Sequence, residues 1–238
     1  MGIYQNAGIF IAFIGVVVVL LYIMRLRARL NKEDPTFWKG EIKAFELLDK
    51  ENKPPDGSIL FIGSSSIRYW KTLKEDMAPL QVLNRGFGGS RISDVIHYTD
   101  RIVFPYKPKT IVFYAGENDL SGLFYTTKKT PEEVRDNFQI FCEKVHVQLP
   151  EVPIYFISIK PPKRRKNLWP EMQTANSLIE DFCNSSELLH YIDIVPPMLD
   201  VEGNPRKDLF RWDGIHLNDL GYEIWTTIIR DILMQHQS

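Results

Sequence analysis

The sequence predicts a three-layer α/β/α sandwich with a mostly parallel, five-stranded sheet, preceded by one N-terminal transmembrane helix. Five short apolar segments alternate with longer segments that carry helical patterns, which is typical of a parallel sheet covered by helices on both faces. The third and fourth apolar segments are continuously apolar, as expected for strands that are buried on both sides. The five predicted strands are residues 58–62, 81–83, 110–115, 153–159 and 190–195.

The segments between these strands are long enough for the helical crossovers that parallel strands require. Thr130 and Glu133 have the spacing of a capping box, with Pro131 at the first helical position. Apolar residues recur at helical spacing from Ile224 to Leu233, which predicts an amphipathic helix near the C-terminus. Ligands of such sheets bind at the carboxyl ends of the strands, so we expect the chemistry in the loops that follow the strands.

The composition excludes several classes of protein. The chain has 238 residues, is 44% hydrophobic and 25% charged, and is therefore not disordered, collagenous or a coiled coil. Its 29 basic and 30 acidic residues give no global attraction for nucleic acid. Two cysteines, Cys142 and Cys183, are too few for a disulfide scaffold or a cysteine-built zinc site. We expect both to be small buried side chains.

The N-terminal segment differs sharply from the average. Residues 1–24 contain no charged side chain, and residues 7–24 are nearly all apolar, which is long enough to cross a bilayer core. A cleavable signal would have its positive charge before the apolar run, whereas here the basic residues follow it, at Arg25, Arg27, Arg29 and Lys32. We predict an uncleaved, single-pass anchor that binds the membrane, with a buried core helix as the alternative. The basic flank favours a cytoplasmic location for the rest of the chain, although a translocated domain can override this bias.

Three parts of the chain follow from these patterns. Residues 1–30 are the predicted anchor with its basic flank, residues 31–57 a linker and packing helix, and residues 58–238 the α/β domain. Asp34-Pro35 is a plausible helix start. The helix that follows has apolar residues at helical spacing and is expected to pack on the domain; they are Phe37, Trp38, Ile42, Phe45 and Leu48.

Two of the loops at strand ends are rich in small residues. Gly63-Ser64-Ser65-Ser66 follows the first predicted strand and precedes a predicted helix. A serine hydroxyl exposed at a helix start is a candidate nucleophile, but it also fits a helix cap or a phosphate cradle. The segment 84–90, NRGFGGS, follows the second strand, and its glycines indicate a tight turn or close approach to a ligand. Their spacing does not match the dinucleotide-binding fingerprint.

Two further loops carry an amide, a carboxylate and an imidazole. Gly116-Glu117-Asn118-Asp119 follows the third strand, where Asn118 can cap a helix or point an amide donor into a cleft. Asp213 precedes His216 by three residues, so its carboxylate can accept from the imidazole Nδ1–H and leave Nε2 free as a base. A solvated loop pair is the simpler interpretation of this spacing. Asn218 is a suitable cap for the last helix.

The order Ser, Asp, His is that of α/β serine hydrolases, but the G-x-S-x-G nucleophile elbow is absent. At these residues the chain resembles the SGNH/GDSL hydrolases, over residues 59–221. Gly63-Ser64-Ser65 matches the first family block, Gly89 the second, Gly116-Glu117-Asn118-Asp119 the third, and Asp213 with His216 the last. Ser64 stands where the family usually has Asp, outside the triad.

The resemblance implies a flavodoxin-like sheet and hydrolysis of acyl esters with no metal and no organic cofactor. It implies a triad of Ser65, Asp213 and His216. It also implies an oxyanion hole formed by the Asn118 amide and the backbone N–H groups of Ser65 and Gly89.

Three functions remain open at this point. The first is a membrane-anchored serine hydrolase of acyl or acetyl esters, with a lipid or an acetylated sugar as substrate. The second keeps this chemistry but acts on O-acetyl groups of a cell-wall or other polysaccharide. The third is a non-catalytic phosphate- or flavin-binding module. The basic segment 160–166, KPPKRRK, is either a solvated loop or a contact for anionic lipid headgroups.

Overall fold

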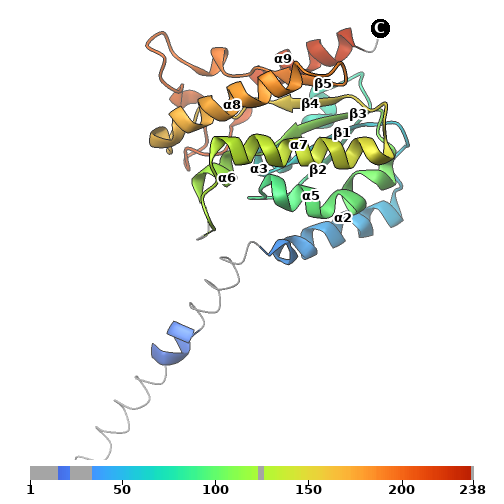
Figure 1. Cartoon of the computed structure of the whole chain (residues 1–238), viewed down its shortest axis with the longest axis horizontal. Helices are drawn as coiled ribbons and strands as arrows, with labels where there is room; N and C mark the ends of the chain where they lie inside the picture. Colours follow the sequence, from blue (N-terminus) through green and yellow to red (C-terminus); the bar gives the residue numbers. More distant parts are fainter. Residues whose placement is uncertain (1–15, 22–33, 123–125, 237–238) are drawn as a thin grey trace, which may run out of the picture.

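A five-stranded parallel sheet forms the centre of the computed structural model, which describes residues 16–21, 34–122 and 126–236 (Figure 1). Its strands are β1 (Ile59–Gly63), β2 (Val82–Gly86), β3 (Thr110–Tyr114), β4 (Ile154–Ile157) and β5 (Leu189–Ile192). They lie in the order β2-β1-β3-β4-β5, and every neighbouring pair is parallel. This is the flavodoxin-like order that the family resemblance implied.

The strand positions were predicted correctly, but the carboxyl ends of β2, β4 and β5 were not. β5 ends at Ile192, whereas the prediction extended this strand to residue 195. β2 continues to Gly86, because Asn84, Arg85 and Gly86 pair with the last three residues of β1. The prediction ended this strand at residue 83 because asparagine and glycine usually mark turns. β4 ends at Ile157, whereas the apolar pattern predicted a strand up to residue 159.

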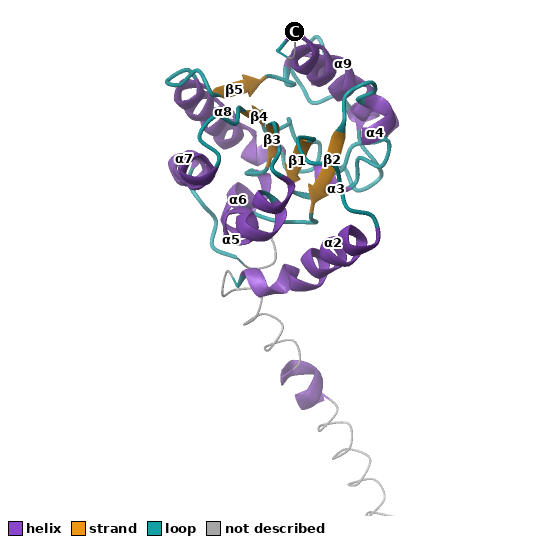
Figure 2. Ribbon diagram, turned by 90° about the vertical axis from the view of Figure 1, so that its right-hand side faces the viewer, coloured by secondary structure: helices purple, strands orange, loops and turns teal. Residues whose placement is uncertain are grey.

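Helices cover both faces of the sheet (Figure 2). One face packs against α5 (Ile92–Ile102), α7 (Pro131–Gln148) and α8 (Trp169–Cys183), and the other against α3 (Ser65–Arg68), α4 (Leu73–Asp76) and α9 (Asp219–Gln235). Alternate strand residues point to opposite faces: Leu60 and Ile62 lie in the first core, and Ile59 and Phe61 in the second. The predicted three-layer sandwich is therefore confirmed.

Other elements of the described residues are α6 (Glu117–Ser121) and the 3₁₀ helices η2 (Phe104–Tyr106), η4 (Lys166–Leu168), η5 (Pro196–Met198) and η6 (Lys207–Leu209).

Local sequence signals set several helix ends. Thr130 and Glu133 form the predicted capping box of α7, and the Asn218 side chain caps α9 by accepting from Gly221 N–H at 3.1 Å. The predicted packing helix is present as η1 (Pro35–Trp38) followed by α2 (Lys39–Glu51). Trp38 and Ile42 bury their side chains in the first core, which fixes this segment on the domain.

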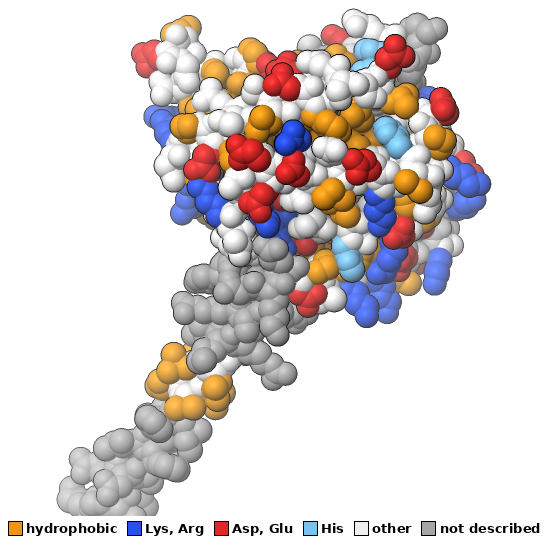
Figure 3. Space-filling model, viewed as in Figure 1, with side chains coloured by type: hydrophobic (Ala, Val, Ile, Leu, Met, Phe, Trp, Pro, Cys, Tyr) orange, Lys and Arg blue, Asp and Glu red, His pale blue; other side chains and the backbone are white. Residues whose placement is uncertain are grey.

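The predicted transmembrane helix falls mostly outside the described residues. Residues 16–21 are helical, and the large side chains Val16, Val18, Val19, Leu20 and Leu21 are 53–58% exposed. They form the small orange group bounded by grey residues in Figure 3. The rest of residues 7–24, and the basic flank, are not among the described residues. Within the described ranges, no helix has both the length and the apolar content needed to cross a bilayer.

Both cysteines are buried free thiols, as expected. Cys142 lies in α7 and Cys183 at the end of α8, and both belong to the first core. Burial raises the pKa of the Cys183 thiol to about 12 and that of Cys142 well above its ordinary value. Neither thiol is therefore available as a thiolate nucleophile.

Candidate active site

The predicted nucleophile, acid and base meet at the carboxyl ends of the strands. Ser65 opens α3 directly after β1, and its Oγ lies 3.0 Å from Nε2 of His216, 151 residues away in the chain. The other ring nitrogen of His216, Nδ1, lies 2.7 Å from Oδ2 of Asp213. A serine, an imidazole and a carboxylate thus form one continuous hydrogen-bonded row. This is the geometry of a nucleophile activated by an oriented base.

Asp213 is held as an ionised hydrogen-bond acceptor. Its Oδ1 accepts from the backbone N–H groups of Ile215 at 2.8 Å and His216 at 2.9 Å. Burial acts to raise the pKa of Asp213, but the bonds from the His216 ring and from these two N–H groups outweigh it and lower the pKa to about 2. An ionised carboxylate must accept from Nδ1–H, so in the neutral imidazole Nε2 is the acceptor that faces Ser65.

The loop that carries His216 is fixed from two sides. The backbone N–H of Arg211 donates to the His216 carbonyl at 2.8 Å, and the Arg211 side chain donates to the Leu217 carbonyl at 2.9 Å. Tyr69 packs edge-to-face on the imidazole, with ring centroids 4.8 Å apart. These contacts orient the ring without using either of its nitrogens.

The predicted oxyanion donors face the same cleft as the triad. Ser65, Gly89, Asn118 and His216 all line a cleft of about 400 Å³. Gly89 has φ of +73°, a left-handed conformation that other residues rarely adopt. Asn118 is 7% exposed, and its Nδ2 donates to the Ser90 carbonyl at 3.1 Å, which holds the amide in place. The structure thus brings all five predicted site residues together.

Two further residues of these loops, Asn84 and Asp119, hold the backbone in place. Asn84 lies in β2, where its Nδ2 donates to the Ile67 carbonyl at 2.7 Å and its Oδ1 accepts from Gly86 N–H at 2.9 Å. It therefore fastens the single turn of α3 that begins with Ser65. Asp119 is buried, accepts from Ile92 N–H at 3.2 Å, and so caps α5. Burial raises the pKa of Asp119 to about 7.

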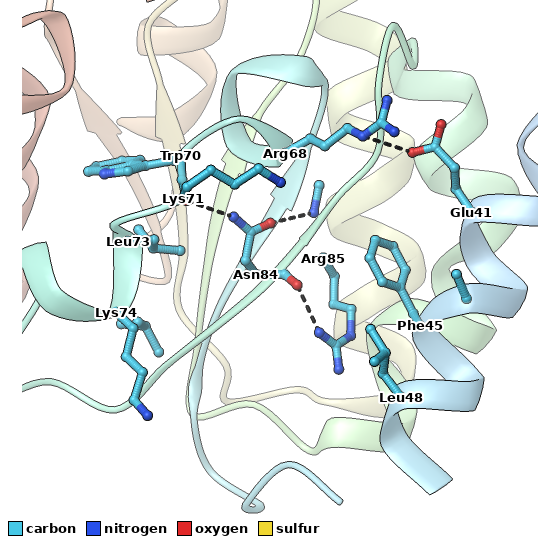
Figure 4. A pocket seen from close by; sticks show the side chains of 13 residues that line it. Glu41, Phe45, Leu48, Arg68, Trp70, Lys71, Leu73, Lys74, Asn84 and Arg85 are labelled. Carbon is cyan, nitrogen blue, oxygen red and sulfur yellow. Dashed lines mark hydrogen bonds and ion pairs between the residues drawn. The ribbon is translucent and has the colours of Figure 1, made fainter. Parts of the chain in front are cut away.

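Part of the cleft wall was not predicted from the sequence. Phe37, Trp38 and Glu41, from η1 and α2, line the cleft together with Arg68 and Tyr69 of the α3 region. Arg68 Nε lies 3.3 Å from Glu41 Oε2, and this ion pair also borders a second groove between α2 and β2, shown in Figure 4. No local sequence pattern indicates that these residues line the cleft, because the cleft joins segments that are far apart in the sequence.

The basic segment 160–166 is not simply a solvated loop. Lys160 is 1% exposed and donates to Glu117, and Arg165 donates to the other oxygen of the same carboxylate at 3.0 Å. Arg165 also lines the cleft. The solvated-loop interpretation is therefore wrong for Lys160 and Arg165, since neither side chain is free in solvent. Contact with anionic headgroups stays a prediction. Arg164 and Lys166 are exposed, and Lys163 is half-buried.

Within residues 16–21, 34–122 and 126–236, no group of three or more His, Cys, Asp and Glu side chains is arranged to hold a metal ion. The cleft is lined by a serine hydroxyl, an imidazole, an amide, a glycine-rich loop and two guanidinium groups.

Solved structures of similar fold come from several hydrolases. A GDSL-like lipase from Bacteroides thetaiotaomicron has a TM-score of 0.69 at 17% identity, covering 82% of this chain and 98% of that chain. A lipase/acylhydrolase from Enterococcus faecalis has a TM-score of 0.64 at 19% identity, covering 76% and 96%. An acetyl xylan esterase has a TM-score of 0.62 at 18% identity, covering 74% and 98%. At these identities the likeness establishes the fold.

The sequence has no match among curated proteins. The model of the GDSL-like lipase/acylhydrolase family does match, over residues 63–224, which is more than half of the chain and includes every residue of the row from Ser65 to Asp213. The chain belongs to the GDSL-like lipase/acylhydrolase family and is a hydrolase of that family.

Proposed function

We propose that this protein is a serine ester hydrolase in which Ser65 is the nucleophile, His216 the general base and Asp213 the residue that orients it. The observation that carries the proposal is the hydrogen-bonded row itself. Ser65 Oγ lies 3.0 Å from His216 Nε2, and His216 Nδ1 lies 2.7 Å from Asp213. The family membership makes an ester the expected substrate.

The geometry supports a two-step acyl transfer. His216 Nε2 takes the proton of Ser65 as Oγ attacks the ester carbonyl, and Asp213 stabilises the resulting imidazolium. The negative charge on the carbonyl oxygen is met by the Asn118 amide and by the backbone N–H groups of Ser65 and Gly89. His216 then gives its proton to the leaving alcohol, and the same base activates the water that releases the acyl group.

A fluorophosphonate probe tests this function directly, because an activated serine attacks its phosphorus, displaces fluoride and becomes phosphonylated. We expect the full chain, in mild detergent, to be labelled on Ser65 and to show no flavin absorbance after purification. An unlabelled protein that carries bound flavin would instead support the non-catalytic binding module.

Replacing Asn118 with Ala is expected to lower kcat by about 10²–10³-fold with a small effect on KM. The amide is held in the cleft wall and is placed to donate to the oxyanion, which exists only in the transition state. Steady-state hydrolysis of a nitrophenyl ester measures the change, with Asn167→Ala as a control at an exposed position. A loss of tenfold or less would assign the oxyanion to other donors.

The substrate class is proposed to be acyl or acetyl esters. One of the structures of similar fold is an acetyl xylan esterase, which favours including O-acetyl sugars beside lipid esters. A panel of short-chain, long-chain and acetylated-sugar esters on the full chain separates these alternatives by kcat/KM. Preference for the acetylated sugar would favour a polysaccharide substrate, and preference for long acyl chains a lipid.

We further propose that residues 7–24 anchor the protein in a membrane, with the hydrolase domain on the cytoplasmic side. The support is the length and apolar character of this segment and the basic residues that follow it. The full chain is expected to remain with membranes in alkaline carbonate, whereas a variant lacking residues 1–30 should be released. Release of both would contradict the anchor. Protease protection of the domain in right-side-out vesicles, but not in inverted ones, would support the orientation.

A further inference from the structure

One buried and one partly buried cation share a carboxylate beside the cleft. Glu117 follows β3 and is 5% exposed in its side chain; Lys160 and Arg165 follow β4, with side chains 1% and 12% exposed. Lys160 Nζ donates to Glu117 Oε2, and Arg165 Nη1 donates to Oε1 at 3.0 Å. Both carboxylate oxygens are therefore used.

This group has one more positive charge than negative. The Lys160 ammonium also donates to the Tyr114 hydroxyl at 3.1 Å, but burial raises the pKa of Tyr114, so that partner is neutral. Burial acts to lower the pKa of Lys160, but Glu117 and Tyr114 outweigh it and raise that pKa above its ordinary value. Lys160 thus remains charged, and Glu117 balances only one of the two cations.

Arg165 brings the uncompensated charge to the catalytic cleft. It lines the cleft with Ser65, Asn118 and His216, and only its Nη1 has a protein acceptor within the described residues. A guanidinium has five N–H donors, so most of them are available to a ligand. Arg68, the other guanidinium of the cleft, differs because it is the only cation paired with Glu41 among the described residues; the Gly88 N–H also donates to that carboxylate.

The position of Arg165 is fixed relative to the catalytic groups. Its carboxylate partner, Glu117, immediately precedes Asn118 in the sequence. Arg164, the residue before Arg165, donates its backbone N–H to the Gly214 carbonyl at 3.1 Å. Gly214 lies between Asp213 and His216 in the sequence. The loop of Arg165 therefore joins the oxyanion side of the cleft to the loop of the base.

We propose that Arg165 determines specificity by binding an anionic oxygen of the substrate, a carboxylate or a phosphate, next to the scissile ester. The preferred substrates are then anionic esters. A partly buried excess cation is costly without a counter-charge, and the planar guanidinium matches both oxyanions. This inference rests on the proposed hydrolase function and narrows its substrate class.

Two matched pairs of esters test the proposal on the full chain in detergent. Mono-4-nitrophenyl succinate against 4-nitrophenyl butyrate places the charge on the acyl side. 1-Butyryl-glycerol 3-phosphate against monobutyrin places it on the alcohol side. We expect the anionic member of at least one pair to have a kcat/KM higher by about tenfold or more, the effect of one charge-assisted hydrogen bond. The pair that shows it identifies the source of the anion.

Variants assign the preference to Arg165. In Arg165→Gln the ratio of anionic to neutral kcat/KM should fall to near one, and Arg165→Lys should keep part of it because the charge remains. Arg164→Gln removes an exposed charge one residue away and should leave the ratio unchanged, since exposed charges are screened by salt and solvent.

Failure of this inference is distinguishable from failure of the function. Hydrolysis of the neutral esters by a chain labelled on Ser65, with no anionic preference in either pair, overturns the role of Arg165 and leaves the hydrolase intact. An equal fall of both rates in Arg165→Gln, leaving the ratio at its wild-type value, also overturns it. If that variant does not fold, Arg165→Lys decides: its ratio of anionic to neutral kcat/KM must lie below the wild-type ratio, and an unchanged ratio overturns the role of Arg165.

Discussion

Replacing Ser65 with Ala is expected to lower ester turnover by several orders of magnitude, on the order of 10⁴-fold or more. The substitution removes only Oγ, whose hydrogen bond is to His216 Nε2, and without this atom no acyl-enzyme can form. The backbone of α3 and its attachment through Asn84 do not depend on the hydroxyl, so the fold should be retained. Hydrolysis rates and fluorophosphonate labelling measure the loss, and circular dichroism checks the fold.

The neighbouring serine provides a matched control. Ser66 is 1% exposed and belongs to the same turn of helix, but its hydroxyl has no bond to the imidazole among the described contacts. Ser66→Ala should therefore retain most of the turnover and the labelling. Near-wild-type turnover in Ser65→Ala, or equal losses in the two variants, would remove Ser65 from its role as nucleophile.

Asp213→Asn is expected to lower kcat by about 10⁴-fold while leaving KM close to its wild-type value. The amide oxygen can still accept from the Ile215 and His216 N–H groups, which places the amide NH₂ opposite Nδ1. Nδ1 must then accept, so the proton moves to Nε2, and Nε2 can no longer take the proton of Ser65. Steady-state kinetics at neutral pH measure the loss; a deficit below tenfold would mean that Asp213 does not control the tautomer.

The low pKa of Asp213 should also make the free energy of unfolding depend on pH. Its folded pKa of about 2 lies below the ordinary value of 3.8, so the ionised carboxylate stabilises the folded state above about pH 4. This contribution is lost as the pH falls from about 4 toward 2. The Asp213→Asn variant has no carboxylate to protonate at this position. The free energy of unfolding of the wild type should therefore approach that of the variant as the pH falls from about 4 to 2, and urea unfolding measures both. A constant difference would contradict the ionised pair.

The loops that contain the site could be predicted because each carries a short local pattern. Parallel strands place their carboxyl ends at one edge of the sheet, so turns after β1, β2 and β3 converge whatever the helices between them do. Asp213 and His216 lie only three residues apart, and a carboxylate at that spacing reaches Nδ1 within one turn. The family resemblance then chose Ser65 among three adjacent serines.

The walls of the cleft could not be predicted in the same way. Arg165 meets Glu117 across 48 residues, and nothing near either residue indicates the other. A basic run looks solvated in sequence, and only the folded chain shows that two of its members pair with one buried carboxylate. Burial of a charge depends on tertiary packing, which composition and periodicity do not encode.

The helix formed by η1 and α2 has a consequence for how the hydrolase acquires its selectivity. Phe37, Trp38 and Glu41 border the cleft, yet they lie upstream of residues 63–224, the region shared with the family. A chain trimmed to the start of β1 would keep Ser65, Asp213 and His216 and lose one side of the cleft. Exchanging this leading segment is therefore expected to change which substrates fit the cleft, while Ser65, Asp213 and His216 keep their places.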